Sequence, residues 1–207
     1  GFQMFAKLSP DGRLAGFVRD NNIFVTDLAT GAETQLTTDG GENVINGTTD
    51  WAYEEELDLR DAFRWSPDGQ RIAFWRLDQT AVRPFYLINA DSLYPVLVPV
   101  RYPKTGTPNS QVRIGVVEIG TGSTTWIDLG AEADIYVAAM DFADSPAEIW
   151  LTRLNRHQSR MDLLLADASK AKEQLRWEPK VKFKDLVKIM VDADMEAMDL
   201  ECPGAGK

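Results

Sequence analysis

Short apolar runs alternate with turn-forming residues over most of the chain, from residue 4 to residue 169. Runs of about four to eight apolar residues, bounded by Gly, Pro, Asn and Asp, are typical of β-strands joined by tight turns. The pattern predicts antiparallel strands with local connections. They are expected over 14–19, 23–27, 33–37, 111–119, 124–129, 135–140, 148–154 and 161–166.

One turn sequence recurs along the chain. Leu-Ser-Pro-Asp-Gly at 8–12 returns as Trp-Ser-Pro-Asp-Gly at 65–69, and an apolar strand follows each copy. A degenerate third copy begins at Phe142 and keeps a Ser-Pro pair at 145–146. In such a turn Pro presets φ, Asp bonds its own backbone and Gly takes the left-handed position. Four-stranded units that repeat at this scale are the signature of a β-propeller, with an ordinary β-sandwich as the alternative.

Two segments depart from this pattern. Residues 80–110 hold prolines at positions 84, 95, 99, 103 and 108. Central strands do not tolerate that density, so we expect an edge-strand or loop excursion there. From Ser169 the apolar spacing becomes helical and predicts helices over 170–175 and 185–198. The predicted fold is mainly β: an incomplete β-propeller of about three blades in residues 1–168, followed by two short C-terminal α-helices within residues 169–207.

Charge and composition narrow the function classes. The formal net charge is −10, which argues against nucleic acid and anionic membranes as partners. Cys202 is the single cysteine, so neither an intrachain disulfide nor a cysteine-based metal cluster is expected. His157, the single histidine, is expected at a surface or in a turn. No stretch approaches the ~18 apolar residues that span a bilayer. The chain opens on Gly1 without a signal peptide, which suggests a fragment and leaves the compartment open.

The candidate site is the run Asp-Trp-Ala-Tyr-Glu-Glu-Glu-Leu at 50–57. Its three adjacent carboxylates, Glu54, Glu55 and Glu56, follow two aromatic residues. Like charges side by side repel one another, and carboxylates are rarely buried without a partner. The run is therefore either a solvated loop or a place that binds a cation, and the residues alone leave both interpretations open.

The run at 49–57, followed by the turn at 65–69, resembles the N-terminal propeller of the dipeptidyl peptidase IV family, serine peptidases of the prolyl oligopeptidase clan. The resemblance covers about residues 4–169 and includes Tyr-Pro-Lys-Thr-Gly at 102–106 and Leu-Asn-Arg at 154–156. It implies that Glu55 and Glu56 bind the free α-amino group of a peptide substrate, from which the intact parent releases N-terminal dipeptides. Two carboxylates satisfy an ammonium group with charge-assisted hydrogen bonds. Glu54 is expected to be structural or solvated.

The resemblance also implies what the chain lacks. In this family the catalytic Ser, Asp and His lie in a C-terminal α/β-hydrolase domain, and no Gly-x-Ser-x-Gly nucleophile elbow occurs here. We therefore expect no catalytic residue, no metal, no cofactor and no activity from this chain alone, with the missing hydrolase domain as its partner. The family suggests a periplasmic or exported location. A non-enzymatic propeller that serves as an interaction module is an alternative.

Residues 162–201 resemble another family, at the C-terminal end of GDP-mannose 4,6-dehydratase. The matching runs are Asp-Ala-Ser-Lys-Ala at 167–171, Leu-x-Trp-x-Pro at 175–179 and Phe-Lys-Asp-Leu-Val at 183–187. Neither a Gly-rich dinucleotide fingerprint nor a Tyr-x-x-x-Lys pair is present. The resemblance implies a chimera joined within residues 162–169. It adds a fragment of a nucleotide-sugar dehydratase as an alternative function, with a cytoplasmic location for that part.

Overall fold

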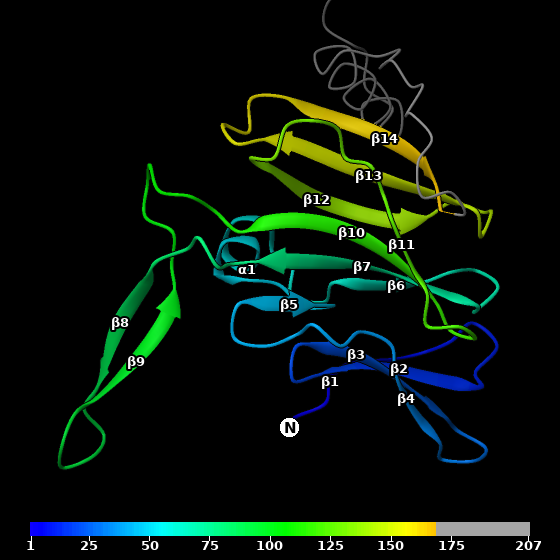
Figure 1. Ribbon diagram of the computed structural model, residues 1–207, viewed down its shortest axis with the longest axis horizontal. Helices are drawn as coiled ribbons and strands as arrows, with labels where there is room; N and C mark the ends of the chain where they lie inside the picture. Colours follow the sequence, from blue (N-terminus) through cyan, green and yellow to red (C-terminus); the bar gives the residue numbers. More distant parts are fainter. Residues whose placement is uncertain (169–207) are drawn as a thin grey trace, which may run out of the picture.

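The computed structural model describes residues 1–168, which form antiparallel sheets (Figure 1). The first sheet contains β1 (Met4–Leu8), β2 (Leu14–Arg19), β3 (Asn22–Asp27) and β4 (Glu33–Gln35). The second contains β5 (Val44–Asn46), β6 (Phe63–Trp65), β7 (Arg71–Asp78), β10 (Gln111–Glu118) and β11 (Thr124–Trp126). The third contains β12 (Ile135–Phe142), β13 (Glu148–Asn155) and β14 (Met161–Asp167). A separate ribbon pairs β8 (Pro84–Asn89) with β9 (Val96–Arg101), and the helix α1 (Trp51–Leu57) lies between β5 and β6.

The first three sheets lie side by side in chain order and do not close into a ring (Figure 1). This arrangement confirms the mainly β class and is consistent with an incomplete propeller. The helices predicted over 170–175 and 185–198 lie outside the described residues. The predicted domain boundary at 168 and 169 coincides with the end of the described part and stays a prediction.

The repeated turn has the same hydrogen bonds in both copies. Ser9 donates its hydroxyl hydrogen to Asp11 at 2.7 Å, and Ser66 donates to Asp68 at 2.6 Å. Each serine oxygen also accepts the N–H of the residue five positions later, at 2.9 Å in both copies. The glycines that follow have φ values of 70° and 66°. The sequence repeat therefore corresponds to a structural repeat. One copy is the turn between β1 and β2, and the other is the turn between β6 and β7.

Apolar side chains between neighbouring sheets form the core. Phe63, Phe74 and Ile23 are buried between the first and second sheets. Trp75 and Tyr53 are buried between the second and third sheets. Burial of a large apolar side chain stabilises a fold by about 1.5–3 kcal/mol. The helix residue Tyr53 thus belongs to the core, although α1 carries three carboxylates.

In the second sheet, two short strands, β5 and β6, together occupy the position beside one edge of β7, where the first sheet has a single strand, β1, beside β2. Both strands pair with β7, and Asn46 lies opposite Arg76 while Phe63 lies opposite Phe74. One β7 residue separates these two partners, whereas sixteen residues, 47–62, separate Asn46 from Phe63 along the chain. Residues 47–62 are therefore an excursion from a single strand, and α1 lies within it.

The excursion leaves and returns at Trp75 of β7. The Trp75 carbonyl accepts the Gly47 N–H at 3.0 Å, and the Trp75 N–H donates to the Ala62 carbonyl at 3.0 Å. Gly47 has φ of 73°, and a Cβ there would lie 2.8 Å from Ile23 and 2.9 Å from Val18. Only glycine suits both the left-handed backbone and the close approach. The departure point of the excursion is thus fixed by backbone hydrogen bonds and by close packing.

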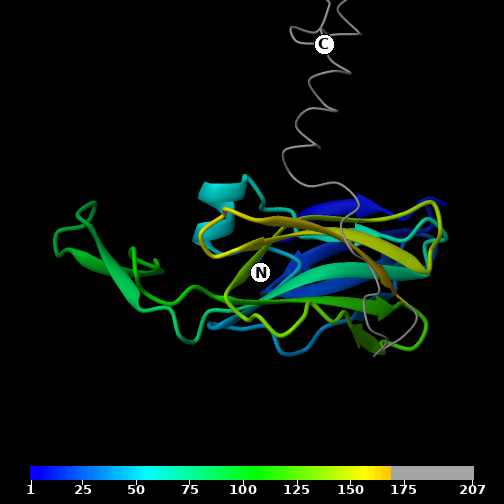
Figure 2. The ribbon, with the colours of Figure 1, turned by 90° about the horizontal axis from the view of Figure 1, so that it is seen from above.

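The ribbon formed by β8 and β9 projects away from the three sheets (Figures 1 and 2). Its strands pair from Pro84 opposite Arg101 to Asn89 opposite Val96. All six residues of β8 are exposed. The predicted excursion over 80–110 is confirmed, and Pro84 is the first residue of its strand, where a missing N–H is tolerated.

Candidate functional site

The carboxylate run at 50–57 forms a short helix, which the sequence analysis did not predict. The Asp50 side chain caps α1 by accepting the Tyr53 N–H at 3.0 Å. Asp58 ends the helix in the left-handed conformation with φ of 50°. The run is thus not a loop. The signal that identifies the helix start is an aspartate directly before the aromatic residues, in the position that Asp favours as an N-cap.

The three carboxylates of α1 are exposed but differ in their partners. Glu54 pairs with Arg60 at 3.2 Å. The side-chain carboxylates of Glu55 and Glu56 have no hydrogen bond or ion pair with any other described residue. The ion pair to Arg60 therefore distinguishes Glu54 from Glu55 and Glu56.

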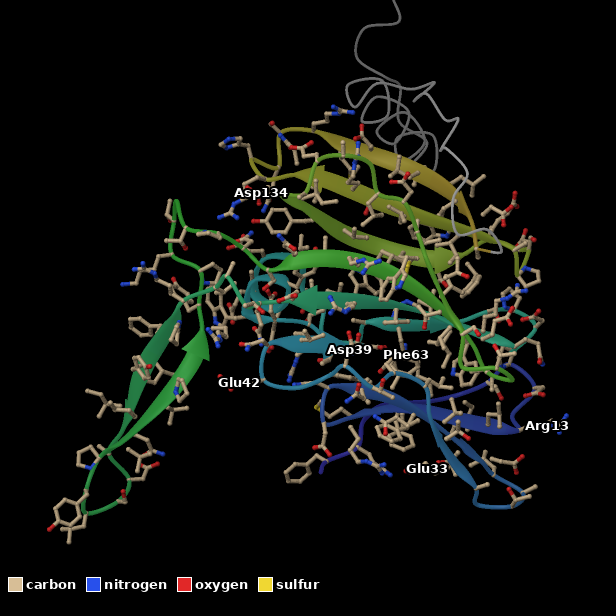
Figure 3. The ribbon with its side chains drawn as sticks, viewed as in Figure 1. Arg13, Glu33, Asp39, Glu42, Phe63 and Asp134 are labelled. Atoms are coloured by element: carbon tan, nitrogen blue, oxygen red, sulfur yellow. The ribbon has the colours of Figure 1, made fainter. Side chains whose placement is uncertain are left out.

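Glu56 borders a cavity of about 610 Å³. The cavity lies between α1, the loop before β10, the start of β12 and the turn after β13. Asp134, labelled in Figure 3, stands directly before β12. The other lining residues are Trp51, Ala52, Pro103, Thr105, Gly106, Thr107, Asn109, Tyr136, Arg156, His157 and Gln158.

The polar groups of this cavity are largely bound to one another. The Asn109 amide donates to the Tyr136 hydroxyl at 2.6 Å. Arg156 pairs with Asp134 at 3.3 Å and donates to a backbone carbonyl of the loop before β10 at 3.0 Å. His157 lies in the turn after β13, as predicted. Glu56 is therefore the carboxylate of the cavity that has no partner among the described residues.

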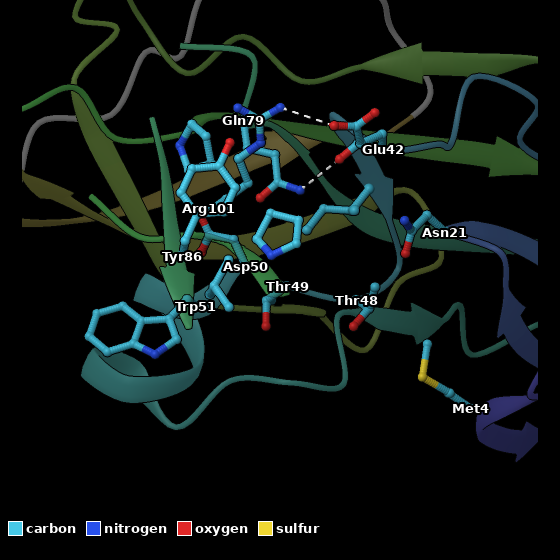
Figure 4. A pocket seen from close by; sticks show the side chains of 14 residues that line it. Met4, Asn21, Glu42, Thr48, Thr49, Asp50, Trp51, Gln79, Tyr86 and Arg101 are labelled. Atoms are coloured by element: carbon cyan, nitrogen blue, oxygen red, sulfur yellow. Dashed lines mark hydrogen bonds and ion pairs between the residues drawn. The ribbon is translucent and has the colours of Figure 1, made fainter. Parts of the chain in front are cut away.

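A second cavity of about 540 Å³ lies between the base of the ribbon and the loop before β5 (Figure 4). Arg101 of β9 pairs there with Glu42 at 3.3 Å, and the Gln79 amide donates to the Glu42 carbonyl at 3.1 Å. Trp51 borders this cavity as well as the first. Sequence reasoning missed Arg101, because two of its side-chain partners, Glu42 and Asn43, lie in a loop almost sixty residues away.

Two findings limit the chemistry of the described residues. Residues 1–168 contain no group of three or more His, Cys, Asp or Glu side chains that could hold a metal ion. In the same part of the chain, no helix has the length and apolar character needed to cross a membrane. The candidate site is thus a pair of exposed carboxylates, of which Glu56 borders a cavity, on a helix inserted into a propeller-like sheet.

These features define a propeller-like domain that presents acidic groups on an inserted helix. A family model for the dipeptidyl peptidase IV (DPP IV) N-terminal region matches residues 1–187. The chain belongs to this family. The match confirms the resemblance on which the assignment of Glu55 and Glu56 depends, but it does not test the role of either residue.

Curated relatives and a solved structure agree with the family match. An Aspergillus fumigatus protein named "Probable dipeptidyl peptidase 4" is 34% identical over 176 residues, which cover 80% of this chain and 23% of that protein. An Arthroderma otae protein named "Probable dipeptidyl-aminopeptidase B" is 31% identical over 82% of this chain and 20% of that protein. The crystal structure of Porphyromonas gingivalis dipeptidyl peptidase 4 has a TM-score of 0.79 and 36% identity, covering 84% of this chain and 25% of that one. The chain thus spans about a quarter of the length of these proteins.

The predicted chimera receives no support from the comparisons. The family model runs through the expected join at 162–169 and continues to residue 187, within the segment assigned to a dehydratase. β14 also pairs with β13 without interruption from Met161 to Asp167. The dehydratase-like tail therefore carries no functional assignment.

Proposed function

We propose that this chain is the part of a dipeptidyl aminopeptidase that binds the free N-terminal amine of a peptide, with Glu55 and Glu56 as the amine ligands. One observation carries the proposal: both carboxylates are exposed on α1 without a partner among the described residues, whereas Glu54 is paired with Arg60. An ammonium group has three donors, and carboxylates accept charge-assisted hydrogen bonds from it.

The charges around the site favour a cationic ligand. The whole chain has a formal net charge of −10. The guanidinium of Arg156 borders the same cavity as Glu56 but is paired with Asp134 at 3.3 Å. It is therefore not free to neutralise the glutamates, and an incoming amine meets unpaired negative charge.

An amine held at α1 limits how much of the peptide extends beyond it. The backbone geometry of the first two residues then sets the distance from the amine to the second peptide bond. Binding of the amine also orients the second peptide bond for attack by a nucleophile elsewhere in the protein. Release of N-terminal dipeptides by a longer protein that contains this segment follows from this arrangement and agrees with the names of the relatives.

The test compares glutamate variants in a binding assay on the chain itself. Chemical-shift titrations with alanyl-proline amide and with its N-acetyl form give the affinity advantage of the free amine. Glu55→Gln and Glu56→Gln are each expected to reduce that advantage by roughly 10-fold, about 1.4 kcal/mol. Glutamine keeps the shape of the side chain and removes the charge, so α1 is preserved.

Glu54→Gln is the matched control, because it removes a charge from the same helix at a position already paired with Arg60. It is expected to leave the amine preference unchanged. Equal losses in all three variants would indicate a general field effect of the acidic helix. Unchanged binding in both the Glu55 and Glu56 variants would refute the assignment.

A further inference from the structure

The helix α1 is too short to hold its own orientation. It has seven residues, whereas isolated helices below about 12–15 residues are marginal in water. The direction in which Glu55 and Glu56 point therefore depends on the contacts of the buried residues around them. Two such residues are Asp50, at the N-cap, and Tyr53, in the first turn.

Asp50 connects the start of the helix to the second sheet. The residue is 6% exposed, and one oxygen of its carboxylate accepts the Tyr53 N–H. The other oxygen accepts the hydroxyl hydrogen of Ser110, which directly precedes β10. These bonds determine where α1 begins. They leave its rotation to be set by a contact further along the helix.

Tyr53 connects the helix to the third sheet. It is 2% exposed, and its hydroxyl oxygen accepts the Val137 N–H at 3.0 Å. Its ring also lies against Tyr136, with centroids 5.9 Å apart. Val137 belongs to β12, an edge strand of its sheet, so a side chain here satisfies a backbone donor that would otherwise be buried without a partner. Burial raises the pKa of the Tyr53 phenol, so the hydroxyl stays neutral.

The Val137 carbonyl is bound by a residue at the root of the excursion, which is the point on β7 where residues 47–62 leave the sheet and return to it. It accepts the indole N–H of Trp75 at 2.8 Å. Trp75 is the β7 residue at which residues 47–62 leave and return. Tyr53 on the helix thus binds the N–H of Val137, and Trp75 at the root of the excursion binds the Val137 carbonyl. The result is a closed linkage of α1, β7 and β12, with Tyr53 as its member on the helix.

We propose that Tyr53 is a positioning residue for amine recognition, because its bond to Val137 and its contact with Tyr136 fix the rotation of α1. The inference rests on the proposed function of Glu55 and Glu56. Glu56 lies three positions after Tyr53, on a neighbouring row of the helix surface. It borders the cavity that Tyr136 also lines. Without the hydroxyl, α1 loses its bond to the third sheet and the carboxylates lose their fixed direction.

The experiment removes one hydroxyl from α1 and one from a matched position. Tyr53→Phe keeps the buried ring and deletes the acceptor of the Val137 N–H. Thr37→Val is the control, since the Thr37 hydroxyl is also buried and accepts a strand N–H, that of Ile23, at 2.9 Å. Both variants leave a buried N–H without its acceptor, but Thr37 contacts the first sheet and not α1.

The readout is the affinity advantage of alanyl-proline amide over its N-acetyl form, together with hydrogen exchange of the α1 amides. Tyr53→Phe is expected to reduce the amine advantage by about 5-fold and to speed exchange in α1. Thr37→Val is expected to lower overall stability and to keep the amine advantage. A merely structural role of Tyr53 would give the same result as the control.

The outcomes separate the two proposals. If Tyr53→Phe keeps the full amine advantage while Glu55→Gln and Glu56→Gln lose it, the positioning role is wrong and the amine site stands. If the glutamate variants also keep it, or if the unaltered chain shows no amine preference, the proposed function is wrong and the positioning role falls with it. If Thr37→Val loses as much as Tyr53→Phe, general destabilisation explains the effect and the positioning role is overturned.

Discussion

Two insertions interrupt the second sheet, and the fold holds them in opposite ways. The excursion at 47–62 contains α1 and places Tyr53 in the core between two sheets. The ribbon of β8 and β9 extends from the same side of the molecule and exposes both of its strands (Figure 2). Both insertions present exposed side chains to solvent. Only the excursion does so from a backbone that buried hydrogen bonds hold in place.

The ribbon is fastened at its base. Arg101 donates to the Val82 carbonyl at 2.8 Å and to the Asn43 side chain at 2.6 Å. Tyr102 packs edge-on against Trp51, with centroids 4.3 Å apart. Beyond the base, large apolar side chains are exposed: Phe85, Tyr86, Leu87, Ile88, Leu93, Tyr94, Val96, Leu97 and Val98. A two-stranded ribbon is only marginally stable on its own in water, so the contacts at its base are needed to hold it. The ribbon is therefore anchored at one end although its strands are exposed.

The largest expected effect comes from the root of the excursion. Trp75→Ala removes a fully buried ring and its bond to the Val137 carbonyl, and is expected to lower the free energy of unfolding by about 3–5 kcal/mol. Tyr94→Ala, at an 80% exposed position near the tip of the ribbon, is expected to change it by less than about 0.5 kcal/mol. Urea denaturation followed by fluorescence measures both. Similar losses in the two variants would contradict the contrast between the insertions.

A smaller effect is expected at the base of the ribbon. Arg101→Met keeps the aliphatic stem but removes the bonds to Val82 and Asn43. Proteolytic cleavage within residues 84–101 is expected to become roughly 5-fold faster, since local opening becomes easier. Hydrogen exchange in α1 is expected to stay unchanged.

The control for the ribbon is Arg83→Met. Arg83 is exposed, and its guanidinium has no hydrogen bond or ion pair with other described residues. Loss of this charge is expected to leave the cleavage rate as it is. Faster exchange in α1 after Arg101→Met would instead show that the two insertions are coupled through Trp51 and Tyr102.

Local signals predicted the elements that the structure confirms. The Ser-Pro-Asp-Gly turns carry their own hydrogen bonds, so a few adjacent residues specify them. The prolines likewise predicted that residues 80–110, which contain the ribbon, leave the sheet. The helix α1 was missed, because seven residues are too few to show a helical period and three of them are carboxylates.

The candidate site was predictable only as residue types. The carboxylate run and its resemblance to a family pointed to Glu55 and Glu56. The division of one strand position between β5 and β6 depends on pairing with β7, which the run itself does not encode. The anchor from Tyr53 to Val137 joins positions 84 residues apart. Such contacts follow from the packing of whole sheets, and no local pattern indicates them.

The smallest expected effect is pH-dependent and again concerns the root of the excursion. Asp39 secures the end of β5 by accepting hydrogen bonds from Asn46 at 3.0 Å and Arg76 at 2.8 Å. Although partial burial opposes it, these bonds hold the pKa of Asp39 below its usual value of 3.8. The stabilisation is therefore present above about pH 4 and is lost as the pH falls through the folded-state pKa. Because the Asp39 side chain is half-exposed, solvent screening keeps its contribution to the free energy of unfolding under about 1 kcal/mol.

Asp39→Asn is therefore expected to lower the thermal unfolding midpoint at pH 6, and the difference from the unaltered chain is expected to shrink toward pH 3. Asp91→Asn is the control on the ribbon, because the Asp91 carboxylate has no hydrogen bond or ion pair with another described residue. It is expected to change the midpoint at pH 6 by less than Asp39→Asn does. A difference that stays constant for Asp39→Asn would mean that its charge does not stabilise the root. The excursion would then be held by contacts other than this ion pair, among them the backbone bonds of Gly47 to Trp75 and the bond of Tyr53 to Val137.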